Sequence, residues 1–128
     1  MHIDLHIHAK EDLLEIRAVS PTDAASIMAA LAQVEADPKA ADKLTTYGEN
    51  QLGTARLGVK RWQAIKGAAE LWRFRAFDCP ATNYRVIYGY HWQTRQICVL
   101  AVVHKEEFDY DDLDSDIATR IITDWRNI

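Results

Sequence analysis

The sequence predicts an α+β fold in one domain over residues 1–128: an N-terminal strand, a helical hairpin, an antiparallel sheet and a C-terminal helix. Three observations predict this class. The chain opens on an alternating polar and apolar segment, continues with two stretches of helical periodicity, and then carries three segments rich in branched and aromatic residues. No internal repeat divides the chain, and 128 residues suit one domain with a modest core.

The first element is expected to be a strand. Residues 2–8, His-Ile-Asp-Leu-His-Ile-His, alternate strictly between polar and apolar side chains. A period of two places alternate side chains on opposite faces of a strand. The inward-facing residues would be Ile3, Leu5 and Ile7, with the histidines on the exposed face.

Two helices should follow and form a hairpin. The first is expected over residues 9–19. Ser20 can cap the second helix and Pro21 suits its first turn. Pro38 should end it, because the residue before a proline resists the α conformation. The next segment, residues 39–67, is polar and punctuated by glycines, which indicates a loop and then a short helix near residues 56–65.

Three strands are then expected over residues 71–77, 84–92 and 96–104, with a hairpin turn between the last two. Alternation in the first of them separates one face, Leu71, Arg73, Arg75 and Phe77, from the other, Trp72, Phe74 and Ala76. The near-continuous apolarity of the third indicates a strand covered on both faces. Asp114 or Ser115 can cap the final helix, whose apolar side would be Ile117, Ile121, Ile122 and Trp125.

Composition favours a cytoplasmic globular protein. Hydrophobic residues make up 48% of the chain and charged residues 27%, but no apolar run approaches the ~20 residues that span a bilayer. The N-terminus has no basic segment followed by an apolar one, as a secretory signal would. Cys79 and Cys98 lack a CxxC partner, so we expect both thiols to be free and reduced.

Charge is distributed unevenly along the chain. The net charge is −4, yet residues 56–105 hold nine basic and two acidic side chains between acidic flanks. A basic middle segment of this kind can form a binding site for a polyanion, although the same charges could be scattered over the folded surface. The overall acidity argues against tight, indiscriminate binding of nucleic acid.

Three local motifs occur in order in the second half of the chain. Residues 71–75 read LWRFR, residues 84–88 read YRVIY, and residues 100–105 read LAVVHK, followed by Phe108 and Tyr110. These motifs resemble, respectively, the "LWELR" strand, the "YRVIY" strand and the "GH(R/K)…Y" ending of the RelE/ParE superfamily of bacterial toxins. The expected order of helices and strands is also that of the superfamily.

The resemblance implies the toxin of a type II toxin–antitoxin module. In the ribonuclease branch such toxins cut mRNA, often on the ribosome, and need no metal or other cofactor. The expected partners are therefore mRNA and a cognate antitoxin, with an acidic or amphipathic segment complementary to residues 56–105. The long segment 44–66 and the acidic stretch 106–116 depart from the compact, basic members of the superfamily.

The matched positions carry the chemistry that RNA cleavage requires. Arginine stays cationic and binds phosphate oxygens, whereas histidine and tyrosine can transfer protons. Arg85 would bind the scissile phosphate with help from Arg75, His104 would act as general acid or base, Lys105 would stabilise charge, and Tyr110 would stack on a base or relay a proton. Looser candidates for contacts with the RNA backbone are Lys60, Arg61, Lys66 and Arg73.

Three alternatives remain open. A ParE-like inhibitor of DNA gyrase would share the fold without cutting RNA. The opening Asp4-Leu5-His6-Ile7-His8 resembles the DLHxH strand of the PHP phosphoesterases, and His6 with His8 is a feasible metal pair. Those enzymes are much larger barrels, however, and only His91 and His104 follow here. A domain of this fold without catalytic activity could also serve as a protein-binding module.

Overall fold

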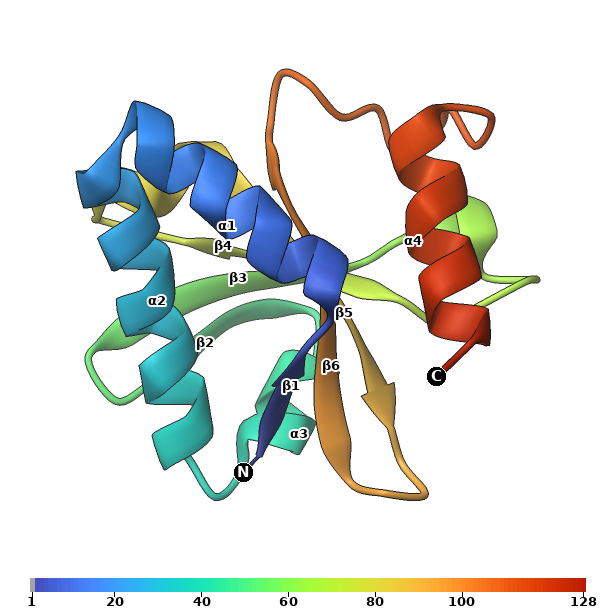
Figure 1. Ribbon diagram of the computed structural model, residues 1–128. Helices are drawn as coiled ribbons and strands as arrows, with labels where there is room; N and C mark the ends of the chain where they lie inside the picture. The colour runs from blue at the N-terminus through green and yellow to red at the C-terminus, as the bar shows by residue number, and fades with distance from the viewer. Residues whose placement is uncertain (1) are drawn as a thin grey trace.

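The structure, a computed structural model, describes residues 2–128. They form a six-stranded mixed sheet with strand order β1-β6-β5-β4-β3-β2, and helices cover both of its faces (Figure 1). The strands are β1 (Ile3–Leu5), β2 (Gly48–Leu52), β3 (Ala55–Arg61), β4 (Trp72–Ala76), β5 (Tyr84–His91) and β6 (Gln96–His104). The helices are α1 (Ile7–Val19), α2 (Pro21–Ala36), α3 (Ala40–Leu44) and α4 (Asp116–Arg126), with short 3₁₀ turns η1 (Gln63–Ile65) and η2 (Pro80–Asn83).

The N-terminal strand is shorter than predicted. β1 pairs in parallel with β6 through three residues and ends at Leu5, where the chain turns into α1. His6 caps this helix, and its Nδ1 accepts the backbone N–H of His8 at 3.1 Å. Ile7 is 58% exposed on the helix, so its predicted inward orientation is wrong. The alternation of polar and apolar residues did not indicate that the pairing of β1 with β6 stops at Leu5.

The helical hairpin agrees with prediction. The side chain of Ser20 accepts the Asp23 N–H at 3.3 Å, Pro21 starts α2, and the helix ends at Ala36 before Pro38. One side of α2 is buried against the sheet. Its buried residues are Ala24, Ile27, Ala30, Leu31 and Val34.

The prediction for residues 39–67 is wrong. In place of a loop and a helix near residues 56–65, this segment contains α3 and the β2–β3 hairpin, and β3 pairs with β4. Gly53 makes the hairpin turn with φ of +59°, which glycine adopts without the strain of a side chain. Leu57 and Val59 alternate into the core. β3 is held in the sheet by pairing with β4, 11 to 19 positions further along the chain.

The remaining strands and the C-terminal helix agree with prediction. Trp72, Phe74 and Ala76 of β4 pack in the cluster under α1 and α2, whereas Leu71 packs in the second cluster, on the opposite face. Residues 97–103 of β6 are buried, as expected of a strand covered on both faces. Ser115 caps α4 by accepting the Ala118 N–H at 3.1 Å. Within residues 2–128, no helix combines the length and apolar character that crossing a membrane would require.

Candidate functional site

An open cavity of about 460 Å³ lies where β3, β4 and β5 meet the segment that follows β6. We call it the basic cavity, because five of its lining side chains are cationic. Contributions come from the end of β3, the start of η1, strands β4 and β5, and the segment that follows β6. The lining residues are Lys60, Arg61, Trp62, Gln63, Ala64, Arg73, Arg85, Lys105, Phe108, Tyr110 and Asp111.

Strand register brings the cations together. Lys60 of β3 is paired with Arg73 of β4, and Arg73 is paired with Ile87 of β5. Arg85 lies two residues before Ile87 on the same strand, so both project from the same face. Lys105 follows β6, and its N–H donates to the carbonyl oxygen of Asn83 at 2.9 Å. Cationic residues separated by up to 45 positions thus line one cavity.

The guanidinium of Arg85 is held against the backbone. Its Nη1 donates to the carbonyl oxygens of Thr82 and Tyr84, both at 2.9 Å. Burial lowers the pKa of Arg85, and the neighbouring charge of Arg73 lowers it further. An arginine nevertheless stays charged at neutral pH. Within residues 2–128, no carboxylate forms an ion pair with Arg73, Arg85 or Lys105.

Aromatic packing positions Tyr110. The indole Nε1 of Trp62 donates to the carbonyl oxygen of Tyr110 at 2.7 Å. The rings of Trp62, Phe108 and Tyr110 meet edge to face, with centroids 4.8 to 5.8 Å apart. Burial raises the pKa of Tyr110 to about 12, although the charges of Arg73 and Arg85 act in the opposite direction. The hydroxyl is therefore protonated at neutral pH.

Two lining residues present buried polar atoms without a partner in the described part of the chain. They are the hydroxyl of Tyr110 and the Nε of Arg61. Buried polar groups in proteins are nearly always hydrogen-bonded, so such atoms mark strain or a place where a ligand completes the bonding. Both atoms can donate to an anionic oxygen.

Three residues predicted for the site do not line the basic cavity. His104 is the last residue of β6 and lies in a separate hollow beside α1, its ring edge-on to Tyr84 at 5.3 Å. Residues two positions apart on a strand share a face. His104 therefore lies on the same face of β6 as Val102, which packs in the cluster under α1 and α2. Arg75 stacks on the ring of Phe77 at 4.3 Å in another hollow. Lys66 is exposed just after η1.

The cavity also contains residues that sequence reasoning missed. Trp62 and Gln63 lie in the segment that was expected to be helical, and Asp111 lies in the acidic stretch after β6. Asp111 adds a carboxylate, a possible proton acceptor, beside the cations. The sequence offers one indication for Trp62, a large aromatic residue directly after Lys60 and Arg61. For Asp111 no local signal distinguished it from the neighbouring acids.

The basic cavity holds no cluster of potential metal ligands. Within residues 2–128, the group of histidine and carboxylate side chains with converging donor atoms is His6, His8 and Asp124, and none of these lines the cavity. Comparison with known protein families, curated proteins and solved structures found no match. The function is therefore inferred from the residues of this chain.

Proposed function

We propose that this chain is a RelE/ParE-type toxin that cleaves mRNA without a metal and thereby inhibits translation. The observation that carries the proposal is the convergence of Arg73, Arg85, Lys105 and Tyr110 in one open cavity. The first three have no ion-pair partner within the described chain, so their charge is available to a phosphate.

The reaction follows from what the cavity offers. The ribose 2′-oxygen attacks the adjacent phosphorus, the bond to the 5′-oxygen breaks, and the products end in a 2′,3′-cyclic phosphate and a 5′-hydroxyl. Arg73, Arg85 and Lys105 stabilise the charge that develops on the phosphorane oxygens. Asp111 accepts the proton of the 2′-hydroxyl, and protonated Tyr110 donates to the leaving oxygen. His104, on the side of α1, takes no part in these steps.

A cleavage assay on a single-stranded RNA, in the presence of a chelator and with or without ribosomes, tests this reaction. Arg85→Ala should slow cleavage at least about 100-fold, as loss of one charge-stabilising donor does elsewhere. Lys10→Gln is the matched control, because Lys10 is an exposed cation on α1, outside the cavity. A substrate with 2′-deoxyribose at the cleaved position should remain intact. Equal cleavage by wild type and Arg85→Ala would refute the proposal.

The same proteins separate the alternatives in cells. Induction in a bacterial host should stop growth and produce new RNA 5′ ends in phase with codons, and both effects should be lost in Arg85→Ala. Growth arrest with intact transcripts and trapped gyrase–DNA complexes would instead identify a ParE-like inhibitor. The absence of arrest would leave a protein-binding module, whose acidic partner would occupy the same cavity.

A further inference from the structure

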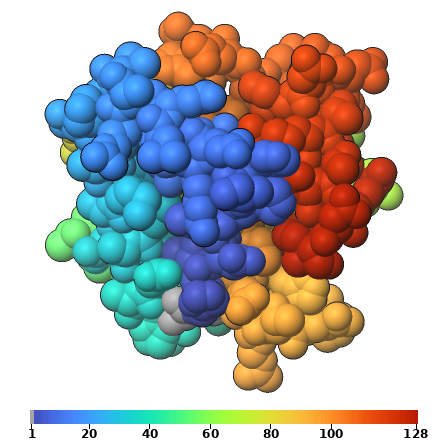
Figure 2. Space-filling view, in the orientation of Figure 1, coloured from blue at the N-terminus to red at the C-terminus, as the bar shows by residue number. Residues whose placement is uncertain are grey.

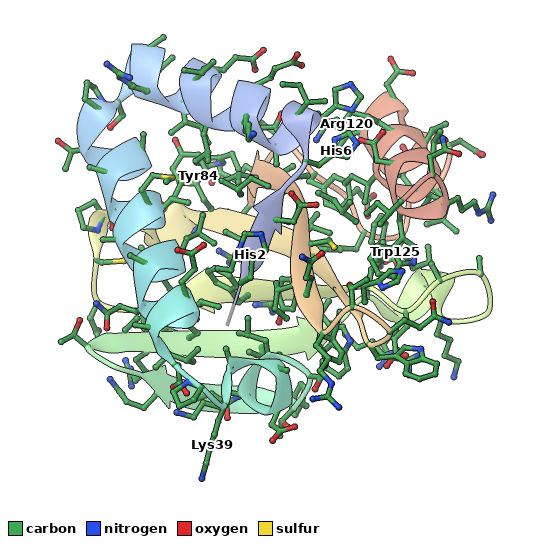
Figure 3. All side chains as sticks on the ribbon, turned by 60° about the horizontal axis from the view of Figure 1, so that its bottom comes forward. His2, His6, Lys39, Tyr84, Arg120 and Trp125 are labelled. Atoms are coloured by element: carbon green, nitrogen blue, oxygen red, sulfur yellow. The ribbon has the colours of Figure 1, made fainter. Side chains whose placement is uncertain are left out.

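A second cluster of functional side chains lies where the N-terminal end of α1 meets α4. Nδ1 of His8 is 2.6 Å from Oδ2 of Asp124, and Nδ1 of His6 is 3.5 Å from the same oxygen. The donor atoms of all three lie within 4.8 Å of one another. Figure 2 shows the start of α1 and α4 side by side on the surface, and Figure 3 labels His6 beside α4.

The carboxylate of Asp124 is buried. Its residue is 8% exposed, and it is the buried charged residue among those described. A buried carboxylate is costly unless it is paired or coordinates a metal. The ion-pairing partners of Asp124 are two imidazoles, from the cap and the second residue of α1, whose side chains are 25% and 38% exposed. The charge of Arg120 also interacts with Asp124.

The hydrogen bonding at His6 leaves two acceptors facing each other. Because its Nδ1 accepts the N–H of His8, that nitrogen carries a lone pair and no proton. Oδ2 of Asp124, 3.5 Å away, is also an acceptor. His8 can donate one proton to Asp124, and the His8 N–H occupies the single lone pair of His6 Nδ1, so no hydrogen bond joins His6 to Asp124. A cation that took over that lone pair would bridge the two acceptors.

We propose that His6, His8 and Asp124 bind one zinc ion or a similar borderline divalent cation. Two imidazole nitrogens and a carboxylate oxygen are a ligand set that zinc accepts. Zinc bonds of ~2.0–2.1 Å to tetrahedral ligands place the ligand atoms about 3.4 Å apart. The 3.5 Å between His6 and Asp124 already fits, whereas the 2.6 Å contact of His8 must open by about 0.8 Å. The two imidazole nitrogens, which lie within 4.8 Å of each other, must adopt the same spacing. Solvent, which reaches both histidines, supplies the fourth ligand.

The ion would join distant parts of the chain. His8 and Asp124 are 116 positions apart, and α4 covers the face of the sheet opposite α1 and α2. When the metal binds, the lone pair of His6 Nδ1 coordinates it and no longer accepts the N–H of His8. A ligand that binds only the folded arrangement stabilises it. The metal site therefore fastens α4 over the second core cluster, independently of any chemistry in the basic cavity.

Calorimetric titration of the metal-free full chain with Zn²⁺ tests the site. Wild type should bind one equivalent, whereas His8→Gln and Asp124→Asn should bind at least about tenfold more weakly. His2→Gln is the matched control, because His2 is an exposed histidine six residues before His8. Mg²⁺, which prefers oxygen ligands, should produce no comparable binding. No stoichiometric zinc binding, or equal binding by all variants, overturns the proposal.

Two measurements on wild type avoid any dependence on how the variants fold. Co²⁺ should give the visible absorption of a tetrahedral site and selectively shift the ring resonances of His6 and His8. Zn²⁺ should slow hydrogen exchange of the α4 amides, residues 116–126, more than those of α2. Unchanged His6 and His8 resonances would refute the ligand assignment, and unchanged exchange in α4 would refute its role in fastening the helix.

Discussion

Two partly buried arginines of this protein differ in whether a carboxylate forms an ion pair with them. Arg120 donates to both carboxylate oxygens of Asp12, at 3.0 and 2.8 Å, and its pKa is raised by that hydrogen-bonded pair in spite of burial. Burial lowers the pKa of Arg85, and the charge of its neighbour Arg73 lowers it further. The pair of Arg120 and Asp12 joins α4 to α1. The two neighbouring charges of Arg73 and Arg85 repel each other, and an anion bound in the basic cavity would relieve that repulsion.

Tyr110 leads to a prediction about alkaline stability. Its pKa is raised to about 12 in the folded protein, above the ordinary value near 10 of an unfolded chain. The unfolded state therefore releases the proton first, and the free energy of unfolding falls as pH rises between those values, by up to about 1.4 kcal/mol per pH unit. Stability below pH ~10 is unaffected by this group. Tyr110→Phe should make the alkaline decline shallower.

Urea unfolding over a series of alkaline pH values measures this effect. Tyr47→Phe is the matched control, since the Tyr47 residue is 74% exposed, and it should follow wild type. Tyr84 and Tyr88, whose pKa values burial also raises, remain in both variants and contribute the same background. Identical slopes for Tyr110→Phe and wild type would contradict the burial of this hydroxyl.

At the scale of elements, the β2–β3 hairpin builds one wall of the basic cavity. β3 extends the sheet beyond β4 and carries Lys60 and Arg61 at its end. The chain then turns into η1, which places Trp62 against the segment after β6. The long segment 44–66, which departs from the compact members of the superfamily, therefore supplies two cations and the support of Tyr110.

The contact between β5 and α4 requires a glycine. A Cβ at Gly89 would lie 2.5 Å from the ring of Trp125, so alanine must displace the helix or the ring. Gly89→Ala should lower the free energy of unfolding by about 1–3 kcal/mol, as overpacking does. Gly67→Ala is the control, because nothing lies within 4 Å of its added Cβ. Chemical denaturation compares the two, and equal stability would contradict the close packing of α4.

At the scale of the whole molecule, local and net charge have opposite signs. The chain carries −4, so its long-range field repels a polyanion, whereas the five cations of the basic cavity attract one at short range. We therefore expect the proposed RNA to bind where its backbone enters the cavity and not over the general surface.

Salt dependence tests the proposed binding of RNA phosphates in the basic cavity. Binding of an uncleavable 2′-O-methyl RNA should weaken with salt by about 0.7 logarithmic units per phosphate contact for each tenfold increase. Lys60→Gln should reduce that slope by about 0.7, because it removes one contact. Lys10→Gln, on α1, should leave the slope unchanged. Equal slopes for both variants would place the RNA outside the basic cavity.

Local signals in the sequence determined the helical hairpin, the strands from β4 to β6 and the C-terminal helix. Ser20, Pro21 and Ser115 act on the nearest turn of chain, and strand alternation acts between neighbours. The same periodicity placed Arg73 and Arg75 on one strand face. The motif resemblance singled out Arg85, Lys105 and Tyr110, which line one cavity with Arg73.

Tertiary structure alone decided which further segments are strands and which side chains meet, because these features depend on contacts between separate elements of the chain. Pairing with β4 made β3 a strand, and the limited pairing with β6 ended β1 at Leu5. Packing of Val102 under α1 set the side on which His104 lies. The approach of α4 to α1 brought Asp124 close to His6 and His8. The sequence does not indicate this contact, because His8 and Asp124 are 116 positions apart.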